Sequence, residues 1–345
     1  MGKELASIKK ILIIIAIPIV FYTLHILSVI VVPLMFGLFF ALLFMPLMRW
    51  FESKRLPTFL GLTSVVIIVS FIFLGSYKIV ELASSELTTI DDDYIARMDV
   101  RLNQLAEPII NLMRINPEEG ESNLSALLNN EKVVANVFSN VSSGINMASD
   151  FLTILLMSVF FMFLFLTGSV NIQNVLKTFV FKQEETSFTV YRQIEKDIFS
   201  FISMKIFISL ITGVSVSVLC YSFGIKFPVF WGVAAFMLNF IQIIGPFVLV
   251  FGLSVFALIE LSYSGTFLAF FLILLAIEAI TGNVLEPIMM GKSFSINTIT
   301  IIVTLSICGL IWGIPGFILS VPITVLVKKI LESFPSTKDF SDIMS

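Results

Sequence analysis

The residues best suited to chemistry in this sequence are two carboxylates that interrupt long apolar runs. Glu278 lies deep in the apolar run 265–281, and Glu286 lies shortly after it. A carboxylate inside a membrane is costly, so it usually pairs, takes up a proton or faces water. We expect Glu278 and Glu286 to carry a proton or a cation. A purely structural Glu278 and a simply solvated Glu286 are the alternatives.

Glu286 belongs to a polar segment, 282–292, that separates the apolar runs 265–281 and 296–334. Its glycines and its proline predict a disrupted backbone, which needs protein or water around it rather than lipid. We therefore expect the segment to line the path of a solute. The path residues expected here are Asn283, Glu286, Pro287 and Gly291.

Two further apolar runs, 228–259 and 296–334, are interrupted in a similar way by glycine and proline. The first would form roughly 48 Å of helix, which is too long for one span and too short for two. Each run predicts a broken helix or a re-entrant hairpin, and such pairs often mark the binding site of a transporter. Kinks or tight turns without any solute are the alternative. The path residues expected in these runs are Asn239, Gln242, Gly245, Pro246, Gly313, Pro315 and Gly316.

Other chemistry finds little support in the sequence. Cys220 and Cys308 lie in apolar runs, and His25 is the single histidine, so neither a disulfide framework nor a zinc site is expected. The motifs of nucleotide hydrolysis, serine hydrolases and zinc proteases do not occur. We predict no enzyme activity, catalytic residue, cofactor or metal, and no nucleic-acid partner. His25 is expected to pack between helices or to lie near the short outer loop, and a proton relay is the alternative.

The composition places these residues in a membrane protein. The chain of 345 residues is 57% hydrophobic and 13% charged, and its mean hydropathy is +1.02. No ordinary soluble domain is so apolar. The sequence predicts an all-α integral membrane protein with the lipid bilayer as its solvent.

The elements that must position the candidate residues follow from the apolar runs. Spans of about 20 residues predict about eight crossings, with broken or re-entrant segments in the C-terminal half. Pro33 and Gly37 mark the turn of a first two-helix hairpin. The predicted spans and interrupted runs are 11–32, 33–51, 57–80, 150–167, 201–223, 228–259, 265–281 and 296–334.

The distribution of Lys and Arg predicts the topology. These residues gather before the first span, after the second, within 168–200 and after the last, so both termini are expected in the cytoplasm. The acid-rich segment 81–149 is expected outside, as a small insertion of amphipathic helices. The predicted parts are the N-terminal helices 1–80, the insertion 81–149, a span with a cytoplasmic amphipathic linker 150–200, the motif-bearing half 201–334 and a cytoplasmic tail 335–345.

The interrupted segments together resemble the AI-2E family, the autoinducer-2 exporter-like permeases. The motifs that carry the resemblance are 239–246 (NFIQIIGP), 282–292 (GNVLEPIMMGK) and 309–322, with Gly313, Gly316 and Pro322. Gln242 stands where many relatives have Pro, and Thr281 stands where many have an acid, with Glu278 one turn earlier.

This resemblance implies a permease of the bacterial inner membrane, a homo-oligomer that exports a small polar solute such as a quorum-sensing signal. Coupling to a proton or cation gradient is one expectation. A passive oligomeric pore, a sodium/proton antiporter and a regulatory membrane protein that binds a partner through its insertion remain alternatives.

Overall fold

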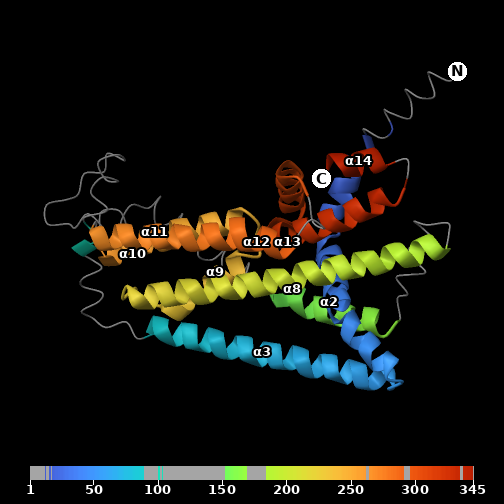
Figure 1. Cartoon of the computed structure of the whole chain (residues 1–345), viewed down its shortest axis with the longest axis horizontal. Helices are drawn as coiled ribbons and strands as arrows, with labels where there is room; N and C mark the ends of the chain where they lie inside the picture. Colours follow the sequence, from blue (N-terminus) through green and yellow to red (C-terminus); the bar gives the residue numbers. More distant parts are fainter. Residues whose placement is uncertain are drawn as a thin grey trace. The chain divides into compact units, whose positions relative to one another are not determined.

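The computed structural model of the chain consists of helices joined by short turns and loops in the residues that it describes, with no strand among them (Figure 1). These residues are 18–88, 152–168, 184–261, 264–290, 296–334 and 337–344, with the single positions 12, 15, 16, 100, 101 and 103. Six helices among them are long and apolar enough to cross a membrane. The prediction of an all-α integral membrane protein is confirmed.

The chain forms two compact units. The first comprises residues 1–69, 151–205 and 289–345, and the second comprises residues 70–150 and 206–288. Two long helices, α3 (Thr58–Thr88) and α8 (Glu184–Ser222), therefore each contribute to both units. The predicted linker 168–200 is helical from residue 184 onward, where it forms the start of α8 and not a separate element.

In the first unit, α2 (Ser28–Ser53) is the central helix. Val32, Phe36 and Phe39 on one part of α2 pack with residues of α8 and of α13 (Thr298–Glu332). Ala41 and Met48, further along, pack with α3 and the short helix Leu152–Leu166. A terminal helix, α14 (Lys338–Ile343), contacts α13. Both apolar clusters of this unit are thus built on α2.

The second unit packs the end of α8 with α9 (Pro228–Leu238), α10 (Ile244–Leu261) and α11 (Gly265–Ile280). Its core contains Val216, Ala235, Leu253 and Phe270, one residue from each helix, all of them inaccessible to solvent. The chain continues from α11 into the π-helix η2 (Thr281–Leu285) and then α12 (Glu286–Met290). One shared core therefore holds the first interrupted run and the helix that carries Glu278.

The first predicted hairpin, with its turn at Pro33, is wrong. Residues 18–26 are helical, and the N–H of Leu27 donates to the carbonyl of Thr23 while that of Val31 donates to Leu27. The helix then runs through Pro33 to Ser53. A proline removes one helical hydrogen bond, and packing of the buried Pro33 against neighbouring helices makes this tolerable in a membrane protein.

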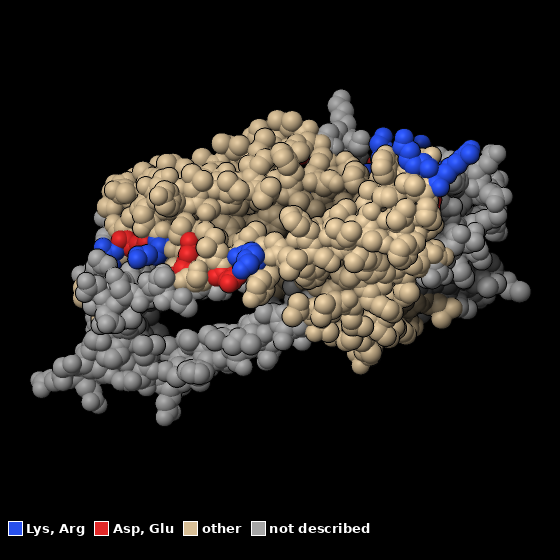
Figure 2. Space-filling model, turned by 90° about the horizontal axis from the view of Figure 1, so that it is seen from below, with Lys and Arg blue, Asp and Glu red and all other residues tan. Residues whose placement is uncertain are grey.

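Many large apolar side chains are exposed, and charged residues stay in small groups on the face shown in Figure 2. Along α3, for example, Phe59, Phe71, Leu74 and Tyr77 are all exposed. An apolar surface of this extent is unusual for a soluble monomer and suits contact with lipid.

Some predicted regions lie outside the described residues. Most of the insertion 81–149 does so, as do residues 169–183 of the linker and Gly291 of the polar segment.

Candidate transport site

The first interrupted run folds into a helical hairpin, as predicted. Helix α9 ends at Leu238, and α10 begins at Ile244. Ile243, just before α10, has a left-handed backbone with φ of 65°. A Cβ on Gly245 would overlap the carbonyl oxygen of Leu238, so only glycine permits so close an approach of the two arms. The ring centroids of Trp231 and Phe256 lie 5.3 Å apart further along the arms.

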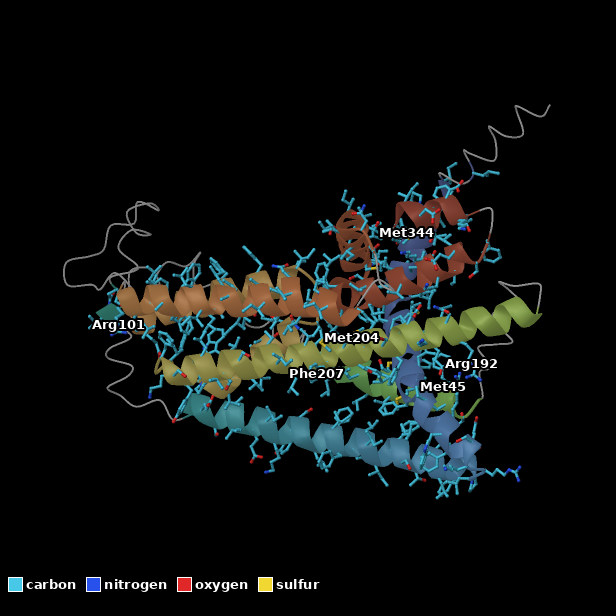
Figure 3. The ribbon with its side chains drawn as sticks, viewed as in Figure 1. Met45, Arg101, Arg192, Met204, Phe207 and Met344 are labelled. Carbon is cyan, nitrogen blue, oxygen red and sulfur yellow. The ribbon has the colours of Figure 1, made fainter. Side chains whose placement is uncertain are left out.

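A side-chain hydrogen bond attaches the turn of this hairpin to α8. The amide Nδ2 of Asn239 donates to the hydroxyl Oγ of Ser209 over 2.9 Å, and both residues are buried. Ser209 belongs to a buried polar stripe on α8 that also contains Lys205 and Thr212. This stripe lies in the stretch of α8 around Met204 and Phe207 in Figure 3.

The base of the same hairpin is held by charged groups. The Glu86 carboxylate accepts hydrogen bonds from the first N–H groups of α9, including that of Val229 at 3.1 Å. Arg101 donates to the carbonyls of Ile259 (2.6 Å) and Glu260 near the end of α10 (Figure 3). An acidic side chain at a helix start and a basic side chain at a helix end both complement the helix dipole. The charged side chains therefore hold the open end of the hairpin, where α9 begins and α10 ends, and Asn239 holds its turn.

The second interrupted run is also a hairpin, because Gly313 breaks α13. Its backbone, with φ of 64° and ψ of −139°, is not helical. A Cβ on Gly316 would overlap the carbonyl of Cys308, and one on Gly309 would overlap the ring of Phe317. The arms on either side of Gly313 thus fold back on each other in direct contact.

The turn of this second hairpin is attached to the N-terminal helix. The break at Gly313 and the missing N–H of Pro315 leave the carbonyl of Ile311 without a helical donor. Nδ1 of His25 lies 2.7 Å from that carbonyl oxygen. Since a carbonyl only accepts, the hydrogen must lie on Nδ1. The indole of Trp312 in turn donates to the carbonyl of Leu24 over 3.1 Å. His25 thus contacts the second hairpin through one ring nitrogen, although the residue is exposed.

In its described part, residues 282–290, the polar segment is helical and not broken, contrary to our prediction. The helix continues from Gly265 to Met289, and it widens into a π turn at Thr281–Leu285. In an α-helix the ring of Pro287 would collide with the carbonyl of Asn283. The wider turn avoids that collision, and the N–H of Glu286 donates to the carbonyl of Thr281, five residues back.

The candidate residues fall into two groups. Eight lie in the second unit: Asn239, Gln242, Gly245, Pro246, Glu278, Asn283, Glu286 and Pro287. Gly313, Pro315 and Gly316 lie in the first. In the second unit Glu286 is buried, Glu278 is half-buried, and Asn283 and Pro287 are exposed. The described residues contain no group of three or more potential metal ligands.

Sequence reasoning missed the polar stripe on α8 and the buried Thr281. The stripe had a detectable signal, because Lys205, Ser209 and Thr212 recur at intervals of four and three residues within an apolar span. The sequence held no such signal for the burial of Thr281, whose hydroxyl donates a hydrogen bond to the carbonyl of Ile277 in its own helix over 2.8 Å.

Buried ion pairs connect three helices of the first unit. Arg49 of α2 pairs with Glu195 of α8, and Lys329 of α13 lies 3.6 Å from Asp197 of α8. Glu195 and Asp197 are both buried. Removing one partner of such a pair leaves an uncompensated charge, so these pairs hold α2, α8 and α13 together.

Taken together, spanning helices, two glycine-dependent hairpins and buried polar groups define a multi-pass membrane protein built like a transporter. The family model described as "AI-2E family transporter" matches residues 11–336. The chain belongs to this family of membrane transporters.

The curated relatives have names that agree with this class. A "Putative transport protein" of Haemophilus influenzae is 25% identical, with 91% of this chain and 90% of the relative aligned. A protein of the same name from Borreliella burgdorferi is 32% identical over 54% of this chain and 52% of its own length. The "AI-2 transport protein TqsA" of Escherichia coli is 26% identical over 92% of this chain and 89% of its own length.

Proposed function

We propose that this transporter exports a small polar solute across the bacterial inner membrane and couples the movement to a proton or cation gradient. The observation that carries the proposal is the pair of hairpins. Each has its turn attached to a neighbouring helix, one through Asn239 and Ser209 and the other through His25 and Ile311. Broken helices with polar attachments suit a solute site that changes its exposure.

The chemistry of the solute is inferred from the polar groups and from one relative. TqsA is named as an AI-2 transport protein, so the proposed solute is AI-2 or a small polar molecule like it. The second unit offers the Asn239 amide, the half-buried Gln242 and the Ser209 hydroxyl, which form hydrogen bonds with such a solute. A role in quorum sensing follows if the exported solute is such a signal.

The two glutamates are the proposed coupling groups. Glu278 is half-buried on α11 and Glu286 is buried on α12. A carboxylate inside a membrane is costly and usually functional. Sodium/proton antiport by the same residues is the second candidate function, and a passive pore formed by several copies is the third.

Flux through reconstituted vesicles distinguishes these functions. Vesicles that contain the purified protein are loaded with labelled AI-2, and efflux is measured with and without an imposed pH gradient. Acceleration by the gradient supports coupled export. Efflux that ignores the gradient supports the pore, and sodium-driven acidification without AI-2 movement supports the antiporter.

A further inference from the structure

The side chains that are buried after α11 do not follow the period of an α-helix. Thr281 is 3% exposed and Glu286 is 7% exposed, whereas Ile288 is 71% exposed. Since an α-helix turns about 100° per residue, Ile288 would lie on nearly the same face as Thr281. Glu286 would lie about 140° away from Thr281 in such a helix. The observed burial of Glu286 and exposure of Ile288 are the reverse of this expectation.

The π turn accounts for the reversal. It holds one more residue than an α turn, so each later side chain takes the direction that the preceding position would have in a regular α-helix. Glu286 then lies only about 40° from Thr281, and Ile288 lies about 120° away. Both values agree with the buried Glu286 and the exposed Ile288.

We propose that the π turn at Thr281–Leu285 is a one-residue register shift that positions the Glu286 carboxylate on the buried face, and that Pro287 is the positioning residue that maintains it. Without the shift, the carboxylate would turn about 140° away from Thr281, to the direction that the exposed side chain of Pro287 now takes. An apolar side chain is suited to contact lipid there, and a carboxylate is not. The proposal rests on the proposed function only where it gives Glu286 a role in transport.

Pro287 is well placed for this role because it disfavours the regular helix locally. Its ring excludes the α-helical position of the Asn283 carbonyl. Gly282, inside the turn, has no atom within 4 Å of the place where a Cβ would be. The turn therefore has space to widen at the position just after Thr281.

Deleting and inserting one residue test the register directly. In a full-length protein whose buried cysteines Cys220 and Cys308 are replaced by alanine, a nitroxide is attached to Ile288→Cys. Val284 is deleted in one variant that also carries Pro287→Ala, and one alanine is inserted after Val284 in another. Collision of the nitroxide with oxygen dissolved in the lipid is then measured in liposomes.

A register shift predicts an asymmetric result. Deleting Val284 removes the extra residue, and Pro287→Ala removes the ring that opposes a regular α-helix, so the turn becomes regular with both flanks unchanged and the label keeps its accessibility to oxygen. The insertion adds a second extra residue, rotates the label away from lipid and causes loss of that accessibility. In an ordinary helix both changes would rotate the label by similar amounts.

Three outcomes overturn the proposal. They are loss of accessibility in the deletion variant, unchanged accessibility in the insertion variant, and failure of the deletion variant to fold when Pro287→Ala alone folds. If only the insertion variant fails to fold, the proposal is supported, because the helix then tolerates the loss of one residue here but not the gain of one. A Glu286→Gln variant that transports normally overturns the role of Glu286 in transport and leaves the oxygen result unaffected.

Discussion

At the scale of single residues, the two intramembrane glutamates are distinguished by position. Glu286 is buried beyond the π turn, and Glu278 is half-buried on the regular helix α11. A carboxylate that faces protein and water in turn must be partly accessible to water. Glu278 is therefore the better candidate to carry the coupling proton.

Replacing Glu278 with Gln should therefore abolish the response of transport to a pH gradient. Glutamine mimics the permanently neutral carboxyl, so solute binding should persist while gradient-driven flux falls to the level of passive exchange. Vesicle flux measured with and without the gradient checks this. Glu81→Gln is the control, because Glu81 is exposed on α3, where its carboxylate lies 2.7 Å from the amine of Lys78. Undiminished gradient-driven transport in Glu278→Gln would remove Glu278 from the mechanism.

His25 illustrates a residue whose contact assigns it a structural role. Because it donates to the carbonyl of Ile311, His25→Phe should leave that carbonyl unsatisfied and destabilise the second hairpin by about 1–3 kcal/mol. Thermal unfolding in detergent measures the loss. The pH dependence of flux should keep its shape, whereas a changed shape with unchanged stability would indicate proton relay.

At the scale of elements, the hairpins could be predicted because glycine and proline interrupt otherwise continuous apolar runs. The side chains that attach their turns could not, since the Asn239–Ser209 and His25–Ile311 bonds join positions 30 and 286 residues apart. The π turn was also missed. Gly282 and Pro287 signalled a disturbance of the helix, but they did not show whether it would break or widen.

The close approach of the hairpin arms makes a sharp prediction about one glycine. Gly245→Ala should place a methyl group on the carbonyl of Leu238, so the arms must separate and the protein should lose about 1–3 kcal/mol of stability. Gly252→Ala is the matched control on the same helix, because no atom lies within 4 Å of its Cβ position. Thermal unfolding of both variants checks this. Equal melting temperatures would contradict the tight hairpin.

At the scale of the whole molecule, composition established the membrane class, and apolar runs placed most helices. The N-terminal region shows where such reasoning stops. A proline within an apolar run is compatible with a turn and with a continuous helix, and the two differ in packing that the sequence does not reveal. Pro33 is buried inside α2, so the positive charges on either side of residues 11–51 no longer imply a hairpin.

The location of the acid-rich insertion does not depend on that region. Arg49, Lys54 and Arg55 precede α3 and predict a cytoplasmic start for it, so residues after α3 should lie outside. In a background without native cysteines, Ser122→Cys should react with an impermeant thiol reagent in intact cells. Ser187→Cys should react only after the cells are permeabilised, because the Lys- and Arg-containing segment before the next span should be cytoplasmic. Labelling of Ser187→Cys in intact cells, with Ser122→Cys protected, would invert the topology, and with it the direction assigned to export.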